Sequence, residues 1–456
     1  KGKIVVMMRF SPDGNNPHSD FYDYAALRYK INTARDNGAT GVLIFTGKEN
    51  DEDDKLVKLS SENLSTDAGI PVLNVSRPLA AVVLRKSEAE LAAIQKSMDQ
   101  SKSPKSFVVK NSIVFEAEVI KERKPTQNVI AYLEGSDAKL KDEFVVIGGH
   151  YDHLGYGGNG SGSLAPDQKK IHYGADDNAS GTAGVLEAAR YFAAHPNALK
   201  RSVIFMCFSG EEMGLLGSAY FTAHPAVPLE KITAMLNMDM IGRMKDSLLS
   251  IGGAGTAQGL RDRCNALNMQ GFKLKLTDDG YGPSDHASFY VKDIPVLFFF
   301  TGNHANYHKP TDTWDKINSA GEASVVNYVC ALAAEFASGT ERLTFTKAKS
   351  NSSSASMASG GGFRVSLGTI PNYAEEVEGV KLDGVREGSV AEKSGIKGGD
   401  IIIGFGAQTI RSIYDYTDAI RAARPGDEVK ITVLRGKEKL ELIARFPDKA
   451  AANVRQ

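Results

Sequence analysis

The chain has few cysteines, almost no net charge and no long apolar run, and each shortage excludes a class of protein. Only three of its 456 residues are cysteines, at positions that match no metal-binding spacing, so a disulfide framework or a cysteine-based zinc module is not expected. The formal net charge is −1 and no basic stripe is visible, which gives no indication of a nucleic-acid partner. No apolar run approaches the roughly 20 residues that a membrane span requires. With 42% hydrophobic and 24% charged residues, the composition is typical of a globular protein.

The sequence leaves the cellular compartment open. Cys207 lies within an apolar run, so buried free thiols are predicted, although counting alone does not exclude a disulfide. The chain starts at Lys1 without Met or a signal-peptide pattern and leads directly into strand-like residues 4–8. We therefore expect that it begins inside a domain and that a targeting segment has been removed.

A chain of this length is expected to form several domains, because single cores rarely grow beyond about 250–300 residues. The first, residues 1–104, alternates strand and helix patterns. Ser87 opens a helix there, with Glu90 three residues later as in a capping box. Further strands are expected at residues 4–8, 41–45 and 70–75, and a helix at residues 24–37.

Residues 105–340 form the largest predicted domain. Strand-like runs alternate with helix patterns such as residues 181–194 and 323–338. This order predicts the α/β class, with a mostly parallel central sheet flanked by helices. The Gly- and Ser-rich residues 157–164 interrupt the pattern, and a long polar loop at strand ends is expected to form a substrate rim.

The C-terminal part separates into a linker and a small domain. Residues 341–362 are predicted as a linker, because residues 350–362 are a Ser/Ala/Gly run. A mainly β domain is expected over residues 363–447, with a late strand at residues 429–434 and a helix at residues 413–422.

Five residues of the types that bind zinc follow apolar runs in the central domain. Four of these runs, at residues 144–149, 203–208, 232–238 and 294–300, are typical of buried strands. Ligands collect outside the carboxyl ends of the strands in an open parallel sheet, so these side chains are expected to converge. Two imidazoles and three carboxylates are a ligand set for two divalent metal ions, which favours a metallohydrolase. The candidate ligands are His150, Asp177, Glu212, Asp239 and His308.

Taken singly, most of these residues have an ordinary structural explanation. A lone histidine at a strand end is more often structural than a ligand. Asp176 and Asp177 are also typical of an N-capping turn, and Glu211 and Glu212 of a solvated pair at a helix start. Asp239 is harder to explain, because a carboxylate in so apolar a run must be paired or bound to a metal. The order of all the candidates along one sheet edge is the stronger signal.

Two acidic residues are predicted to assist the ligands. Asp152 follows His150 by two residues, and its carboxylate could hold the second ring nitrogen and fix the tautomer. Two Zn²⁺ ions would be balanced by the three carboxylate ligands and a bridging hydroxide. Glu211 is surplus to that balance, so it is predicted to be the general base that takes a proton from the water bridging the metals.

Five segments of the central domain resemble the co-catalytic dizinc aminopeptidases, a family that includes glutamate carboxypeptidase and the non-catalytic transferrin receptor. They are GGHYD (148–152), GADDNASG (174–181), SGEEMG (209–214), NMDM (237–240) and YHKPTDT (307–313). The resemblance spans about residues 110–335.

This resemblance implies roles for the ligands. Asp177 would bridge two zinc ions, with His150 and Asp239 completing one site and Glu212 and His308 the other. Glu211 would be the general base. The choice of Asp177 over Asp176 comes from the resemblance alone.

Other polar residues have more than one candidate role. Tyr307 resembles a tyrosine that in some family members donates a hydrogen bond to the oxyanion, with a packing role as the alternative. Residues 284–286 (Ser-Asp-His) are adjacent and cannot converge as a nucleophilic triad. The resemblance instead implies that residues 281–286 line the substrate pocket. For Arg243, a substrate contact and an ion pair both stay open.

The flanking domains also resemble known modules. Residues 1–104 resemble a protease-associated domain, truncated at its N-terminus. Residues 363–447 resemble a PDZ domain of the bacterial protease type, on the loop at residues 366–368 and on Gly399-Asp400-Ile401-Ile402. PDZ domains bind extended chain termini as an added strand, and a packed appendage without a ligand is the alternative.

Together these features predict a zinc-dependent aminopeptidase acting on peptides or proteins. A carboxypeptidase, a dipeptidase or a glutaminyl cyclase-like enzyme would use the same site. A non-catalytic peptide-binding protein or a PDZ scaffold would belong to a different class. The resemblance implies an extracytoplasmic location, whether periplasmic, secreted or surface-anchored. The sequence predicts neither the side-chain preference nor the native metal.

Overall fold

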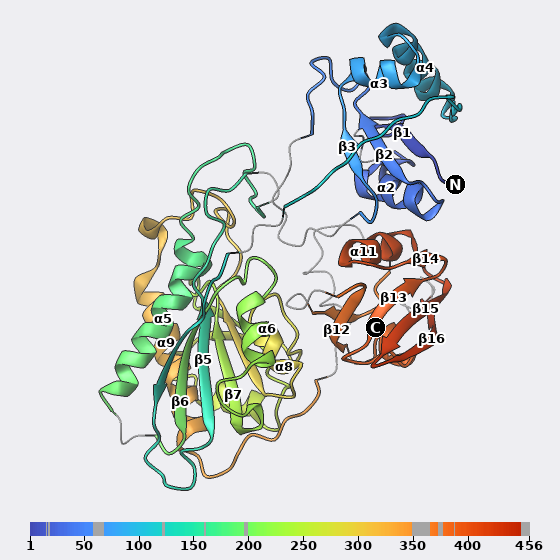
Figure 1. The fold of residues 1–456 in the computed structure, drawn as a ribbon. Helices are drawn as coiled ribbons and strands as arrows, with labels where there is room; N and C mark the ends of the chain where they lie inside the picture. The colour runs from blue at the N-terminus through green and yellow to red at the C-terminus, as the bar shows by residue number, and fades with distance from the viewer. Residues whose placement is uncertain are drawn as a thin grey trace.

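The structure is a computed structural model. It describes residues 1–14, 16, 19–57, 68–120, 124–158, 161–195, 199–348, 365–372, 377–386 and 388–447. The described residues form an N-terminal domain, a central domain and a C-terminal domain (Figure 1). The Ser/Ala/Gly run predicted as a linker lies outside the described residues. Residues 341–348, predicted as the start of that linker, instead pack on the central domain, where Leu343 is buried and Phe345 forms a β-bridge with Ala257.

The N-terminal domain is a small three-stranded parallel sheet with helices. Its strands β1 (Ile4–Met8), β2 (Gly41–Phe45) and β3 (Val72–Asn74) lie in that order. The helices are α1 (Tyr22–Ala25), α2 (Leu27–Asp36), α3 (Arg77–Leu84) and α4 (Glu88–Ser101). The capping box of Ser87 and Glu90 is confirmed. The single helix expected over residues 24–37 is interrupted, because Ala26 has an extended ψ of 132°.

A seven-stranded sheet forms the centre of the molecule, in the order β4-β6-β5-β7-β10-β8-β9. The strands β6, β5, β7 and β10 run parallel, whereas β4 is antiparallel to β6 and β8 is antiparallel to β10. The predicted mostly parallel sheet is therefore confirmed, with antiparallel pairs toward its edges. The strands are β4 (Val129–Leu133), β5 (Phe144–His150), β6 (Ser202–Phe208), β7 (Ile232–Met238), β8 (Leu248–Gly252), β9 (Lys273–Leu276) and β10 (Val296–Phe300). The last begins after Pro295, which has no N–H to donate to a neighbouring strand.

Both faces of this sheet are covered, so β5, β6 and β7 are buried along their whole length. Alternate strand residues point to opposite faces. One set packs with α5 (Gly181–Ala193), α7 (Leu260–Ala266) and α9 (Ser319–Ser338). The other set packs with α6 (Leu216–Ala223) and α8 (His286–Tyr290). Short turns η1 (Ala175–Ser180), η3 (Leu229–Lys231) and η4 (Trp314–Lys316) complete the domain.

The C-terminal domain is a β sheet with two helices. Its strands are β11 (Thr369–Pro371), β12 (Val380–Val385), β13 (Ile401–Phe405), β14 (Gln408–Thr409), β15 (Glu428–Arg435) and β16 (Glu438–Arg445). The main order is β11-β12-β13-β15-β16, which leaves β11 at one edge. The helices are α10 (Val390–Lys393) and α11 (Ile413–Ala422), and α11 has the bounds expected from the sequence.

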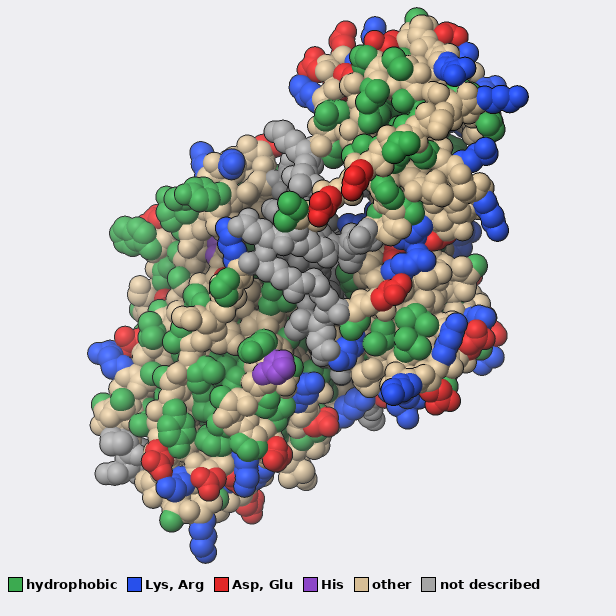
Figure 2. Space-filling view, viewed as in Figure 1, with side chains coloured by type: hydrophobic (Ala, Val, Ile, Leu, Met, Phe, Trp, Pro, Cys, Tyr) green, Lys and Arg blue, Asp and Glu red, His purple; other side chains and the backbone are tan. Residues whose placement is uncertain are grey.

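Two expectations from composition can be checked on the described residues. All three cysteines are buried free thiols, as predicted. No helix in the described ranges is both long enough and apolar enough to cross a bilayer. Figure 2 shows acidic and basic side chains interspersed on the face it displays, without a stripe of one sign.

Candidate metal centre

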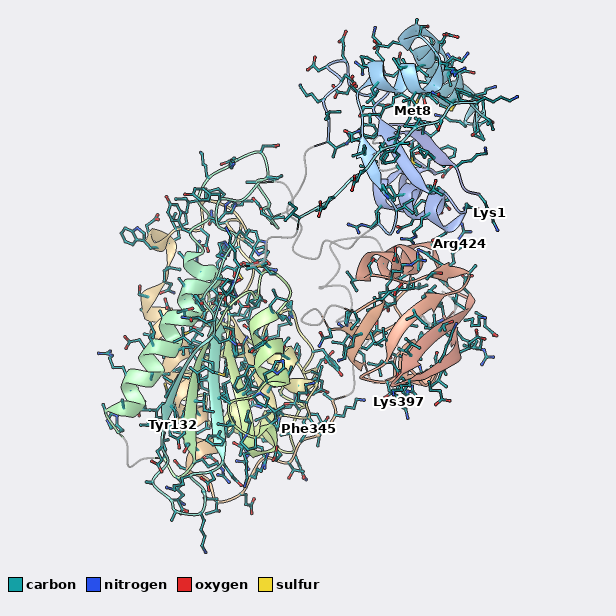
Figure 3. The ribbon with its side chains drawn as sticks, viewed as in Figure 1. Lys1, Met8, Tyr132, Phe345, Lys397 and Arg424 are labelled. Carbon is teal, nitrogen blue, oxygen red and sulfur yellow. The ribbon has the colours of Figure 1, made fainter. Side chains whose placement is uncertain are left out.

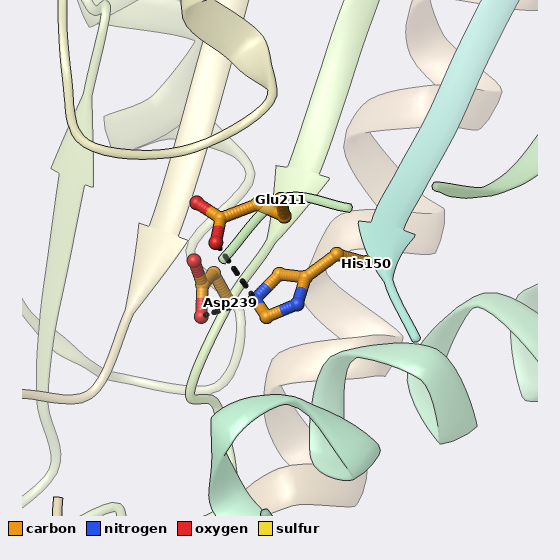
Figure 4. A group of neighbouring side chains, drawn as sticks. All are labelled: His150, Glu211 and Asp239. Atoms are coloured by element: carbon orange, nitrogen blue, oxygen red, sulfur yellow. Dashed lines mark ion pairs between the residues drawn. The ribbon is translucent and has the colours of Figure 1, made fainter. Parts of the chain in front are cut away.

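The carboxyl ends of three adjacent strands bring acidic side chains around a buried histidine. His150 is the last residue of β5, Glu211 follows β6, and Asp239 comes directly after β7. The His150 Nε2 atom lies 3.6 Å from Asp239 Oδ1 and 3.9 Å from Glu211 Oε2 (Figure 4). These three side chains form one group with the spacing of metal ligands.

A second group with the spacing of metal ligands lies beside the first and consists of His153, Asp177 and Glu212. Next to this group lies His308. Its Nε2 atom is 3.2 Å from Asp177 Oδ2 and 3.3 Å from Glu212 Oε2. The other oxygen of Asp177, Oδ1, lies 3.5 Å from Nε2 of His150. The two oxygens of Asp177 therefore face two different histidines. All five candidate ligands come together, with Asp177 between the two groups.

The distances in these groups fit metal ions better than direct hydrogen bonds. The four separations between imidazole nitrogen and carboxylate oxygen within the candidate ligand set are 3.2–3.6 Å. A charge-assisted hydrogen bond would be about 2.7–2.9 Å long. Two tetrahedral ligands bound to zinc at about 2.0–2.2 Å lie roughly 3.3–3.6 Å apart. The donor set and its spacing thus fit two zinc ions that share Asp177.

The far ring nitrogens fix both imidazoles in the form that binds a metal. His150 Nδ1 lies 3.1 Å from the main-chain carbonyl oxygen of Asp152. His308 Nδ1 lies 2.9 Å from the carbonyl oxygen of Gly162. A nitrogen that faces a carbonyl oxygen carries a proton, so in the neutral ring the lone pair is on Nε2 and is directed into the site.

Asp152 has a different task from the one expected. Its carboxylate Oδ1 is 3.8 Å from His150 Nδ1, so the main-chain carbonyl replaces the predicted carboxylate as the partner of that ring. The carboxylate instead accepts the main-chain N–H groups of Glu211 at 3.1 Å and Glu212 at 3.3 Å. Asp152 therefore positions the two glutamates rather than the histidine.

The site is buried, and its carboxylates require neighbouring positive charge. His150, Asp177 and Asp239 are 1%, 3% and 8% exposed. Burial opposes the charged forms, yet the neighbouring imidazoles of His153 and His308 lower the pKa of Glu212 to about 2. Asp177 and Glu212 likewise overcome burial and raise the pKa of His308 to about 10. Divalent cations supply the charge that these carboxylates otherwise draw from protonated imidazoles.

Glu211 differs from the ligands in distance and in pKa. It lies 3.9 Å from His150 Nε2, farther than Asp177 at 3.5 Å or Asp239 at 3.6 Å. Burial raises the pKa of Glu211 well above its usual range. A raised pKa makes a carboxylate a stronger base, which suits a group that takes a proton from water.

His153, for which the sequence predicts no role, contacts a candidate ligand directly. Its Nδ1 atom lies 2.6 Å from Glu212 Oε1. The other oxygen of Glu212, Oε2, remains directed toward His308. The only signal in the sequence is that His153 directly follows Asp152. We infer that His153 orients Glu212.

Asp312 was also missed, although it lies in the segment YHKPTDT. Its Oδ2 atom accepts the main-chain N–H groups of Asp176 at 2.9 Å and Asp177 at 3.1 Å. Its Oδ1 atom pairs with Arg243 at 3.1 Å, so the ion-pair alternative for that arginine is present. Asp176 contacts His304 at 3.1 Å, and it lies in neither group of ligand-spaced residues.

Two further predictions concern residues beside the ligands. The ring of Tyr307 stacks on His308 with 3.8 Å between centroids, and burial raises the pKa of its hydroxyl. Tyr307 is thus a protonated donor at neutral pH. Ser284 Oγ accepts a hydrogen bond from Asn237 at 2.9 Å, while the His286 ring stacks on Phe298. These residues do not form a nucleophilic triad, as expected.

Comparisons with known sequences agree with this geometry. Residues 128–333 match Peptidase family M28, and residues 352–444 match the PDZ domain. The first match contains all five candidate ligands. The chain is 26% identical to aminopeptidase YwaD of Bacillus subtilis (strain 168) over 330 residues, which cover 70% of this chain and 59% of that protein. It is 28% identical to probable leucine aminopeptidase 2 of Aspergillus oryzae (strain ATCC 42149 / RIB 40), over 45% of this chain and 43% of that protein. The chain thus spans about half the length of these relatives.

Two solved structures were found to be similar at 22% identity. The aminopeptidase from Aneurinibacillus sp. strain AM-1 covers 76% of each chain with a TM-score of 0.43. A zinc aminopeptidase from Bacillus subtilis covers 75% of this chain and 72% of its own, with a TM-score of 0.44.

Proposed function

We propose that this protein is a metallo-aminopeptidase that removes N-terminal residues from peptides with two zinc ions, because residues 128–333 match peptidase family M28. The observation that carries the proposal is the position of Asp177, whose Oδ1 faces His150 and whose Oδ2 faces His308. A carboxylate shared in this way is what two adjacent metal ions require.

The five candidate ligands divide between the two ions. His150, Asp177 and Asp239 would hold one ion, and Asp177, Glu212 and His308 the other. Bound zinc would supply Lewis acidity, lowering the pKa of a water molecule and polarising the scissile carbonyl group.

Glu211 and Tyr307 would move and stabilise charge during hydrolysis. Glu211, buried and with a raised pKa, would take the proton of the attacking water and deliver it to the leaving amine. Tyr307, held against His308, would donate a hydrogen bond to the oxyanion that develops on the carbonyl. Asp152 would keep Glu211 in place through its main-chain N–H.

A panel of aminoacyl-p-nitroanilides tests this function. We expect cleavage of substrates with a free amino group, loss of cleavage with a zinc chelator, and recovery when zinc is restored. Zinc content measured on the same samples should fall and rise with activity. A protein that holds zinc but leaves all free-amine substrates uncut would refute the aminopeptidase proposal and direct attention to blocked or C-terminal substrates.

The PDZ domain and the cellular location are part of the proposal. The edge strand β11 offers a place for an extended chain terminus to add as a strand. We also propose an extracytoplasmic location, which cell fractionation of the native host would test; recovery of the protein in the cytoplasm alone would contradict it.

A further inference from the structure

The PDZ domain contacts a loop of the central domain that leads toward the metal centre. This substrate loop, residues 277–285, connects β9 to α8. The Tyr281 hydroxyl donates a hydrogen bond of 3.3 Å to the carbonyl oxygen of Val385, the last residue of β12. In Figure 1, α8 and β12 are on the sides of the two domains that face each other. One side chain thus joins the loop to the PDZ sheet.

The surroundings of Gly384 show that the contact extends beyond one hydrogen bond. A Cβ atom on this glycine would lie 3.5 Å from the Tyr281 hydroxyl oxygen and 3.8 Å from Val291 Cγ1. Lys347 and Glu392 add an ion pair of 3.4 Å between the domains. The outward side of β12 is therefore in van der Waals reach of the central domain.

The N-terminal domain holds the PDZ domain from another side. Asn32 Nδ2 donates a hydrogen bond of 2.5 Å to Asp415 Oδ1, and both residues are buried, at 6% and 2% exposed. Arg411 lies 3.5 Å from Asp36 across the same boundary. Buried polar pairs require a fixed geometry, so α11 and α2 keep the PDZ domain in place.

Within the central domain, the substrate loop is connected to the metal centre. The Tyr281 ring packs edge-on against the buried ring of Tyr290, with 4.6 Å between centroids. Phe345, labelled in Figure 3 on the side nearest the PDZ domain, packs against Tyr290 at 5.6 Å. At the other end of the loop, Ser284 accepts a hydrogen bond from Asn237, two residues before the candidate ligand Asp239.

The composition of the loop makes outside contacts important. Gly280, Gly282 and Pro283 surround Tyr281, and glycines allow many backbone conformations. The bond from the Tyr281 N–H to Asp279 is local, at 2.9 Å. The long-range contacts of Tyr281 and Ser284 therefore select one conformation of the loop.

We propose that the docked PDZ domain holds the substrate loop in the conformation that binds substrate, with Tyr281 as the positioning residue. This rests on the proposed peptidase function and on the hydrogen bond of Ser284 with Asn237, which joins the loop to the strand that carries the candidate ligand Asp239. Removing the contact should weaken substrate binding while leaving the proton transfer by Glu211 intact. It should therefore raise KM rather than lower kcat.

Substitutions at Gly384 test the docking. Gly384→Trp places a large side chain against Tyr281 and Val291 of the central domain and Ile370 of β11, whereas Gly384→Ala adds only the Cβ that the structure accommodates. With leucine p-nitroanilide we expect a KM at least about tenfold higher for the Trp variant, and a KM near that of the unmodified protein for the Ala variant. An equal rise in KM for both substitutions would overturn the proposal, because the rise would then come from a change within β12 and not from the lost contact with Tyr281.

Tyr281→Phe provides a second variant that retains the packing of the ring. Loss of one hydrogen bond predicts a rise in KM of about two- to tenfold with little change in kcat. Tyr220→Phe, at a tyrosine that is 60% exposed on α6, is the matched control. Zinc content should match the unmodified protein in all four variants.

Hydrogen exchange separates this inference from the proposed function. Amides of residues 277–285 should exchange faster in Gly384→Trp and Tyr281→Phe, whether or not a substrate is cleaved. Faster exchange in a protein without aminopeptidase activity would retain the docking and refute the function. Unchanged exchange and KM in a folded, active Gly384→Trp protein would refute the docking alone.

Discussion

Replacement of Glu211 by glutamine separates the base from the ligands. The amide has the shape of the carboxylate but cannot accept a proton from water. General-base catalysis contributes about 10²–10⁴-fold, so kcat should fall by that factor, which corresponds to about 3–5 kcal/mol of activation free energy. Zinc content should not change, because His150, Asp177 and Asp239 remain around the same ion.

The neighbouring residue supplies the matched comparison. Glu212 Oε2 lies 3.3 Å from His308 Nε2, within the range of two ligands on one zinc ion. Glu212→Gln should therefore lose metal from that position, and its activity should recover in part at high zinc concentration. Glu211→Gln should show no such recovery, because its defect is in proton transfer.

The assay is kcat and KM on leucine p-nitroanilide together with zinc content by atomic absorption. Glu187→Gln, a change on the exposed surface of α5, controls for the loss of one negative charge. The distances also group Glu211 with His150 and Asp239, as expected of a metal ligand. The zinc content of Glu211→Gln therefore decides whether Glu211 is a ligand or a base. Zinc lost from Glu211→Gln and retained in Glu212→Gln would show that the two roles are reversed.

Three further substitutions test the site. His153→Gln should weaken zinc binding about 10- to 100-fold in a zinc titration, because Glu212 would lose the partner that orients it. His172→Gln, in the same loop, should leave zinc affinity unchanged, and equal affinities of the two variants would contradict the orienting role of His153. Asp239→Asn should reduce bound zinc from about two ions to about one per chain, and unchanged stoichiometry would argue against its ligand role. Tyr307→Phe should lower kcat about 10²-fold with unchanged zinc content, and a normal kcat would leave Tyr307 a packing residue.

Local sequence patterns predicted helices and strands correctly where a single local interaction determines where they begin and end. The runs that became β5, β6 and β7 are buried on both faces, so their apolar composition defines their extent. The Ser87 capping box is equally local. By contrast, α3 was not predicted, since its boundaries depend on packing in the N-terminal domain. The resemblance of that domain to a protease-associated domain stays a prediction.

The candidate ligands were predictable because strand order alone brings strand ends together. The residues that orient them were not, because those contacts depend on how loops cross the site. The Asp312 carboxylate is 135 residues from the Asp177 N–H that it binds. His153 reaches Glu212 across 59 residues. Neither pairing has a periodicity or spacing that a single sequence displays.

One short segment explains how a base and a ligand occupy neighbouring positions. Glu211 faces His150 in one group and Glu212 faces His308 in the other, so consecutive side chains serve different metal positions. The two oxygens of Asp152 accept both main-chain N–H groups and fix this division. A change at Asp152 would therefore disturb proton transfer and metal binding together, whereas a change at either glutamate would disturb only one. Loss of both proton transfer and metal binding in one variant would distinguish Asp152, which positions the segment, from Glu211 and Glu212, which act in it.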